Sequence, residues 1–298
     1  MTTTIAPDAT APTPRRRRPP GRPRGTFVGT LLAFVVLGAW VLGSLFPLYW
    51  NAIAAFLPVD EIFSSPPPFY PHEPTVENFL GLQVQIPTMW RNIGNSLIVA
   101  TVGSVLNVFL ATLAGFAFAK LRFWGKEAFF YGIIATMAIP ALVGFVPLFL
   151  LMGRLGLGDN IIAVILPSIA GAFGVFLFRQ VMESLPEDLF EAAAIDGAGR
   201  FRMYRVIALP LITPMIMTQL IVLFLGSFND YFWPLVILRS PENYTFSLAL
   251  GSITGQNYAT PWGELMAGAL ILQVPVLIIF AFLPRFIVPN SLAGAVKG

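Results

Sequence analysis

Residues that could do acid–base, nucleophilic or metal chemistry are scarce in this chain of 298 residues. There is no cysteine and a single histidine, His72. A thiol nucleophile, a disulfide, an iron–sulfur cluster and a histidine-rich zinc site are therefore excluded. The 15 Asp and Glu residues all lie outside six long apolar stretches of the chain. We predict no catalytic residue and no metal site.

A nucleotide-binding loop is also missing from the sequence. Backbone cradling of phosphates needs a string such as G-x-x-x-x-G-K-[ST]. The nearest fragment, Gly125-Lys126, is followed by Glu127 and lacks the leading glycine. We predict that the chain is not an enzyme, that it binds no cofactor of its own, and that any ATP is hydrolysed elsewhere.

The segment 179–205 combines acidic residues with an apolar pattern of helical period. Ser184 and Glu187 have the spacing of a capping box, and Gly197 is a typical helix stop. We expect a short amphipathic helix, about Leu185–Asp196. Such a helix could lie on the bilayer, but its excess of acids suits an anionic leaflet poorly and favours a groove on a protein partner. The expected apolar stripe is Leu185, Leu189, Ala192 and Ala193.

Six apolar stretches must position these residues. The chain is 56% hydrophobic and 11% charged, whereas a soluble domain carries roughly a quarter charged residues. A helix of about 20 apolar residues crosses the hydrocarbon core, and helices satisfy their own backbone there. We predict an all-α integral membrane protein with six spans, kinked at internal prolines. The spans are about 27–50, 93–119, 128–153, 161–178, 206–229 and 265–284.

The distribution of basic residues predicts the orientation of these spans. Fifteen of the 18 Lys and Arg residues fall on one side of the membrane, and Arg91, Arg154 and Arg239 on the other. Both termini are then cytoplasmic by the positive-inside rule. The net charge of +3 needs no nucleic-acid partner. Residues 1–25, rich in Thr, Pro and Arg, are expected to be a disordered cytoplasmic tail. The segments 51–92 and 239–264 are expected as outer loops where a partner docks.

At this point the sequence resembles the permeases of bacterial ABC importers. Glu191-Ala192-Ala193, Gly197, Ile207 and Leu209-Pro210 reproduce their EAA signature. The extended form in the sugar-importer branch adds Asp196, Ala198 and Pro214. Further resemblance lies in Ser227-Phe228-Asn229-Asp230, although many relatives have Trp-Asn in place of Phe228-Asn229. The ending Gly294–Gly298 is similar to that of the maltose-importer inner subunit, and the resemblance covers about 27–298.

The resemblance implies a type I ABC importer permease in a bacterial inner or plasma membrane. Such a chain, here residues 26–298, pairs with a second homologous permease, two copies of a cytoplasmic ATPase and an extracytoplasmic solute-binding protein. ATP and Mg²⁺ bind only the ATPase. The implied solute is a carbohydrate, with a sugar-related solute such as glycerol phosphate as the alternative. A loop of about 182–210 would couple to the ATPase through Glu191, Ala192, Ala193, Asp196, Gly197, Ile207, Leu209 and Pro210.

Polar residues within or beside the spans are the candidates for lining the solute path. Amide and carboxylate groups with an aromatic ring suit a sugar, but such residues often only bond a neighbouring helix. The candidates are Asn107, Gln219, Asn229, Asp230 and Trp233.

Two other classes of membrane protein fit less well. An ion-driven secondary transporter usually places Asp, Glu or His inside the bundle, and an intramembrane hydrolase needs paired acids or a nucleophile with its base there. No ionisable residue lies within the six predicted spans.

Overall fold

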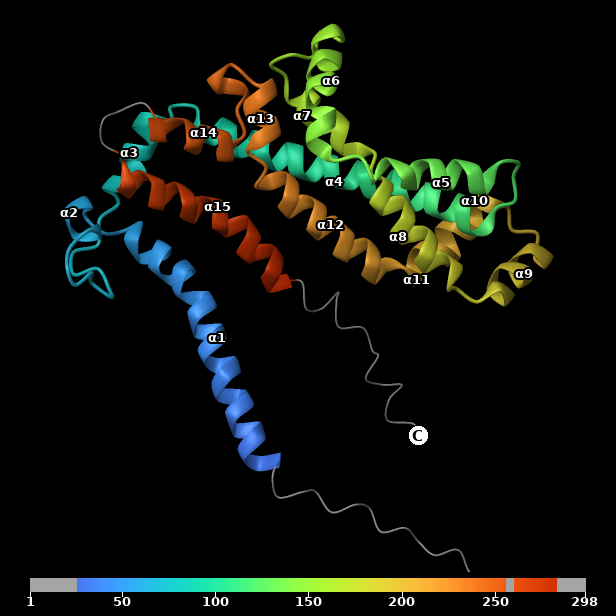
Figure 1. Ribbon diagram of the computed structural model, residues 1–298, viewed down its shortest axis with the longest axis horizontal. Coiled ribbons are helices and arrows are strands. Elements are labelled where there is room, and N and C mark those ends of the chain that lie inside the picture. The colour runs from blue at the N-terminus through green and yellow to red at the C-terminus, as the bar shows by residue number, and fades with distance from the viewer. Residues whose placement is uncertain (1–25, 256–259, 283–298) are drawn as a thin grey trace, which may run out of the picture. The chain divides into compact units, whose positions relative to one another are not determined.

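The computed structural model describes residues 26–255 and 260–282, and every regular element within them is a helix (Figure 1). The predicted tail, residues 1–25, and the ending Gly294–Gly298 lie outside the described residues. The longer helices are α1 (Thr26–Ala54), α3 (Glu77–Gln85), α4 (Met89–Lys120), α5 (Lys126–Thr136), α6 (Ala141–Arg154), α8 (Ala172–Glu183), α9 (Glu187–Ile195), α12 (Thr213–Phe228) and α15 (Trp262–Phe282). The shorter ones are α2 (Val59–Ile62), α7 (Ile161–Ile165), α10 (Arg200–Met203), α11 (Leu209–Leu211), α13 (Phe232–Ile237) and α14 (Phe246–Ser252).

The chain divides into two compact units. The first unit ends at Tyr49, and its described residues all belong to α1. Helix α1 continues to Ala54, and its stretch Gly29–Ala54 is long and apolar enough to cross a membrane. The second runs from Trp50 onward and holds all the other helices.

The second unit is built around α4, the longest helix, with α8 and α12 packed along it (Figure 1). Two glycines allow the close approach of α4 and α8. A Cβ atom at Gly115 would lie 2.7 Å from Phe178 Cβ, and one at Gly174 would lie 2.9 Å from Ala111 Cβ. Glycine at these contacts therefore sets the spacing of the two helices.

Two of the predicted spans are bent pairs of helices instead of continuous helices. Residues 128–153 form α5 and α6, which meet at 97° with Pro140 at the start of α6. Residues 206–229 are divided at Ile212, where the segment Arg200–Leu211 meets α12 at 77°. Proline restricts the preceding residue and donates no backbone hydrogen bond, which favours a break at such sites. Pro147 and Pro275, by contrast, lie inside α6 and α15.

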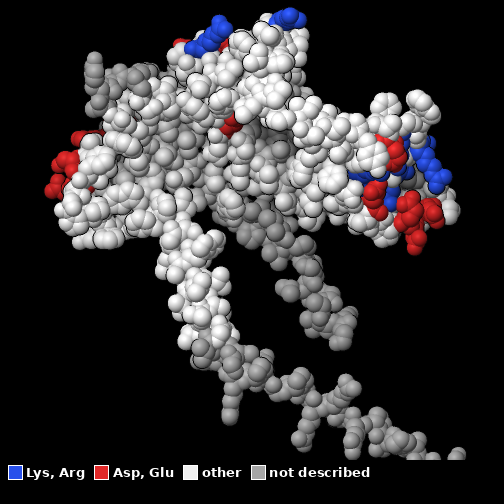
Figure 2. Space-filling model, in the orientation of Figure 1, with Lys and Arg blue, Asp and Glu red and all other residues white. Residues whose placement is uncertain are grey.

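The number of spans follows from how these pairs are counted. Four helical stretches within the described residues are long and apolar enough to cross a membrane alone, and six spans result if each bent pair is one span. On the face drawn in Figure 2, charged side chains gather around α5, α9 and α10 and near α2, α6 and α13. The broad surface between them is uncharged except for one acidic group. The all-helical membrane fold is thus as predicted.

The expected outer loops contain helices that close the end of the second unit. The segment 51–92 includes α2 and α3, and α3 packs against α15. The segment 239–264 includes α14, which buries Phe246 completely. Asn95 Nδ2 donates to the carbonyls of Glu242 and Tyr244, both at 3.0 Å, and Ser96 Oγ accepts from Phe246 N at 2.8 Å. Buried polar groups of α4 therefore fix the chain before α14.

A carboxylate joins the turn before α7 to the turn after α13. Asp159 Oδ1 accepts hydrogen bonds from the backbone N–H groups of Arg239 at 2.8 Å and Ser240 at 3.0 Å, and Ser240 Oγ donates to Oδ2. Burial alone would raise the pKa of the Asp159 carboxyl. The hydrogen bonds from Ser240, Arg239 and Asn243 outweigh it and lower that pKa from 3.8 to about 2.

Candidate functional site

The predicted coupling helix exists as α9, Glu187–Ile195, and one aromatic side chain anchors it. Phe190 is 6% exposed and its ring lies 6.3 Å from that of Phe116 on α4. Lys120 Nζ lies 4.5 Å above the Phe190 ring, 3.1 Å from the carbonyl oxygen of Leu185 and 2.6 Å from Glu187 Oε2. The C-terminal end of α4 therefore holds the N-terminal end of α9.

The predicted capping box is wrong. The residue before α9 is Pro186, which has no side chain to cap the helix, and Ser184 Oγ instead donates to the carbonyl of Val181 at 2.7 Å. Ser184 is the C-terminal cap residue of α8, and the Glu187 carboxylate forms an ion pair with Lys120. The helix is accordingly shorter than expected at both ends.

The stop at Gly197 is as predicted. Gly197 has φ +75°, a left-handed conformation that glycine adopts without penalty. Its N–H bonds the carbonyl of Ala194 at 3.0 Å, and the N–H of Ala198 bonds that of Ala193 at 2.9 Å. This pair of bonds is a Schellman motif, which satisfies the last carbonyls of α9.

The predicted coupling residues divide between an exposed and a packed group. Ala193, Ile207 and Leu209 are half-buried, and Ile207 and Leu209 pack against the core around Phe190 and Tyr204. Ile195, which was not predicted, is 87% exposed. A hollow of about 170 Å³ lies between Asp196 on one side and Val206 and Ile207 on the other. The exposed predicted residues are Glu191, Ala192, Asp196, Gly197 and Pro210.

A π-helical turn, Tyr204–Ala208, connects this loop to α12. Tyr204 is 3% exposed, and its hydroxyl is hydrogen-bonded to Thr112 Oγ1 on α4 at 2.9 Å. Its ring lies 5.4 Å from the Phe116 ring. The loop is thus tied to α4 at both ends, through Lys120 before α9 and Tyr204 after it.

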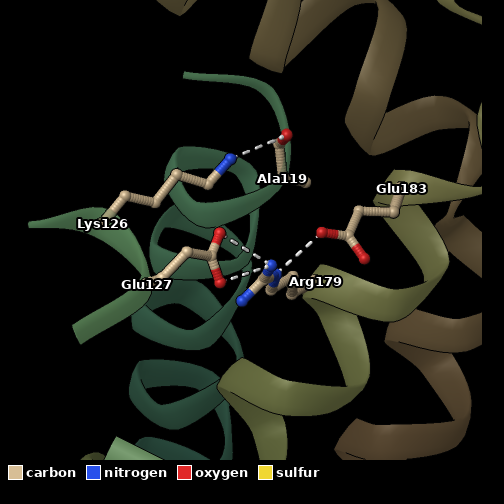
Figure 3. A network of polar contacts seen from close by, with 5 residues as sticks. All are labelled: Ala119, Lys126, Glu127, Arg179 and Glu183. Carbon is tan, nitrogen blue, oxygen red and sulfur yellow. Dashed lines mark hydrogen bonds and ion pairs between the residues drawn. The ribbon is translucent and has the colours of Figure 1, made fainter. Parts of the chain in front are cut away.

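A charged cluster between α5 and α8 was not predicted (Figure 3). Arg179 on α8 binds both carboxylate oxygens of Glu127 at 3.1 Å, donates to Glu183 Oε1 at 2.7 Å, and stacks over the Phe130 ring at 3.8 Å. These contacts join the start of α5 to the end of α8. The i,i+4 spacing of Arg179 and Glu183 was the only local signal for it.

The five candidates for the solute path lie in different surroundings. Asn107 is buried and donates to the carbonyl of Ser168 at 2.6 Å, and Gln219 is buried on α12. Asn229 is exposed and donates to the carbonyl of Leu225 at 2.9 Å, within its own helix end. Asp230 and Trp233 are brought together at one hollow of about 720 Å³.

No group of three or more His, Cys, Asp or Glu residues that could hold a metal ion occurs within residues 26–255 and 260–282. The arrangement of the described residues instead offers a docking helix and a hollow among helices.

Known proteins share this sequence and fold. Residues 107–291 match the family described as binding-protein-dependent transport system inner membrane component. The chain is 34% identical to the arabinooligosaccharides transport system permease protein AraQ of Halalkalibacterium halodurans, over 86% of this chain and 92% of that protein. It is 30% identical to the lactose transport system permease protein LacG of Rhizobium radiobacter, over 90% and 96%.

Two further proteins extend the comparison: a relative named for a phosphate-bearing solute, and a protein of known structure. The sn-glycerol-3-phosphate transport system permease protein UgpE of Brucella abortus is 29% identical, over 90% of this chain and 96% of that protein. A bacterial ABC transporter involved in the import of the acidic polysaccharide alginate matches with a TM-score of 0.80 and 22% identity, over 91% of this chain and 100% of that one, which supports the fold. These relatives are permease subunits, so the predicted resemblance and the prediction of a non-enzyme are confirmed. The chain belongs to the family of binding-protein-dependent transport system inner membrane components.

Proposed function

We propose that this chain is a permease subunit of a carbohydrate importer and forms half of the solute path. Relatives named for arabino-oligosaccharides, lactose and diacetylchitobiose support a sugar. The relative named for sn-glycerol 3-phosphate keeps a sugar-related solute as the second candidate. A second homologous permease forms the other half, and a solute-binding protein delivers the sugar from outside.

We infer that energy enters through α9. A cytoplasmic ATPase, present in two copies, binds ATP and Mg²⁺ and receives the exposed face of α9. ATP-driven closure then biases the permease between inward- and outward-facing states. The observation that carries this proposal is the anchoring of α9: Phe190 and Lys120 hold one face, while Glu191, Ala192 and Ile195 remain exposed.

Co-purification with the ATPase tests the proposal. Glu191→Lys reverses a charge on the exposed face without removing a contact to the rest of the chain. We expect this variant to insert normally, to retain less ATPase than the wild type, and to lose solute uptake. Glu73→Lys, an equal charge change on an exposed residue of the outer segment, should retain the ATPase. Normal uptake and ATPase retention by Glu191→Lys would rule out α9 as the coupling element.

A further inference from the structure

The hollow beside Asp230 has the size of a ligand site. Its volume of about 720 Å³ lies in the range of small-molecule pockets. Helices α6, α7 and α12 and the start of α13 surround it. Its lining residues are Ala141, Gly144, Phe145, Leu148, Val164, Pro167, Ser168, Val222, Leu223, Gly226, Ser227, Asp230 and Trp233. Among these described residues, Asp230 is the one charged side chain.

The break between α12 and α13 presents Asp230 to the hollow. Helix α12 ends at Phe228, and Asp230 Oδ1 accepts the backbone N–H of Phe232 at 3.1 Å, near the start of α13. Two serines, Ser227 and Ser168, add hydroxyl groups to the lining. The site therefore combines one carboxylate with two hydroxyls on an otherwise apolar wall.

Trp233 supplies an aromatic surface without a spare donor. Its Nε1 donates to the carbonyl of Ala163 at 3.0 Å, and its ring lies 5.4 Å from that of Phe145 in an edge-on arrangement. Trp233 is 7% exposed and held in place, so the small part of it that lines the hollow is apolar ring surface. A ring beside hydrogen-bonding groups is chemistry that suits a sugar.

We propose that Asp230 makes this hollow a subsite for an uncharged or cationic sugar and excludes solutes that carry phosphate or carboxylate. This rests on the proposed function and decides between its two candidate solutes, because sn-glycerol 3-phosphate is an anion and the oligosaccharides are not. A carboxylate accepts hydrogen bonds from sugar hydroxyls. It repels a second anion, and no cation among the described lining residues offsets its charge.

The natural absence of cysteine allows a direct test of the charge in the hollow. Ser227→Cys in the assembled transporter places one thiol in this chain, beside Asp230. We measure the rates at which the cationic reagent MTSET and the anionic reagent MTSES modify it. The MTSET rate divided by the MTSES rate should fall about tenfold or more when Asp230→Asn is added. That substitution removes the negative charge and keeps the shape of the side chain.

A thiol outside the hollow is the control. Thr254 is exposed and is not one of the residues that line the hollow. At Thr254→Cys the ratio of the MTSET rate to the MTSES rate should not change when Asp230→Asn is added. An unchanged ratio at Ser227→Cys, or no reaction there with either reagent, would overturn the proposal.

Uptake by the complete transporter separates this proposal from the proposed function. Labelled lactose, arabinotriose and diacetylchitobiose are compared with lactobionate and sn-glycerol 3-phosphate. We expect uptake among the first three and none of the last two. Preferred uptake of either anion would refute the charge selection but leave the permease in place. Failure of the assembled chain to import any solute with its ATPase and binding protein would refute the proposed function itself.

Discussion

Gly197 has a backbone geometry on which the proposed coupling through α9 would depend. Its φ of +75° ends α9 and directs the chain into α10. No atom lies within 4 Å of where its Cβ would stand. A substitution here is therefore opposed by backbone conformation alone, so the position tests the effect of the positive φ without a steric clash.

We predict that Gly197→Val weakens uptake and ATPase retention, whereas Gly197→Asn largely preserves both. A β-branched residue in the left-handed region costs about 1–2 kcal/mol, and Asn tolerates that region better. Uptake and co-purification of both variants at matched abundance make the comparison. Equal losses in Val and Asn would mean that the positive φ is not what matters.

Asp159 provides a second prediction at the scale of one residue. Its carboxyl pKa is lowered from 3.8 to about 2 in the folded chain. The stabilisation by the carboxylate is therefore fully present above pH 3.8 and is lost as the pH falls through about 2. Amide protection of Arg239 and Ser240, corrected for intrinsic exchange, should fall across that interval. In Asp159→Asn protection should be low and free of this pH dependence, and a wild-type-like profile would contradict the assignment.

The contact of α4 with α8 is decided at the scale of helices. At Gly115 an added methyl would meet Phe178 Cβ at 2.7 Å and the backbone N of Arg179 at 3.0 Å, neither of which is a flexible side-chain end. We predict that Gly115→Ala destabilises the chain by about 1–3 kcal/mol through overpacking. Gly132→Ala on α5, where nothing lies within 4 Å, is the matched control. Thermal unfolding in detergent should separate the two, and equal midpoints would argue against the close approach.

The link between α4 and α9 is a second property of helices. Lys120 is 7% exposed at its side chain and bonds both Glu187 and the carbonyl of Leu185. Lys120→Met removes these charge-assisted bonds, worth about 1.5–3 kcal/mol each in favourable settings, and keeps an apolar stem over Phe190. We predict faster hydrogen exchange in residues 187–195. Lys126→Met removes a longer bond of 3.4 Å, to Ala119, and should leave that segment unchanged. If both variants exchange alike, Lys120 does not hold α9.

The orientation of the whole chain remains a prediction from the basic residues. Fifteen Lys and Arg residues are expected inside and three outside, so both termini should be cytoplasmic. A reporter active only outside the cytoplasm should work after Glu73, and one active only inside should work after Gly125 and after Gly298. A cytoplasmic signal at Glu73 would overturn this topology. A cytoplasmic signal after Gly158, between α6 and α7, would show that the α5–α6 pair does not cross as one span.

The sequence by itself determined the class of protein and the place of the short helix α9, for which coupling is proposed. Long apolar stretches without charge can only be helices in lipid, and that follows from composition alone. Gly197 and the EAA spacing are equally local, because a left-handed stop depends on a few neighbouring residues. The capping box at Ser184 failed because a local pattern competed with a distant partner, Lys120, which takes Glu187.

Only the tertiary structure decided where the polar residues face. Asn107 and Asp230 look alike in sequence as polar groups in or beside apolar spans, yet Asn107 bonds Ser168 on a neighbouring segment and Asp230 lines a hollow. The bends of 97° and 77° place α6, α12 and α13 around that hollow. Helix rotation and bend angle arise from packing among segments far apart in the chain, so no local pattern encodes them.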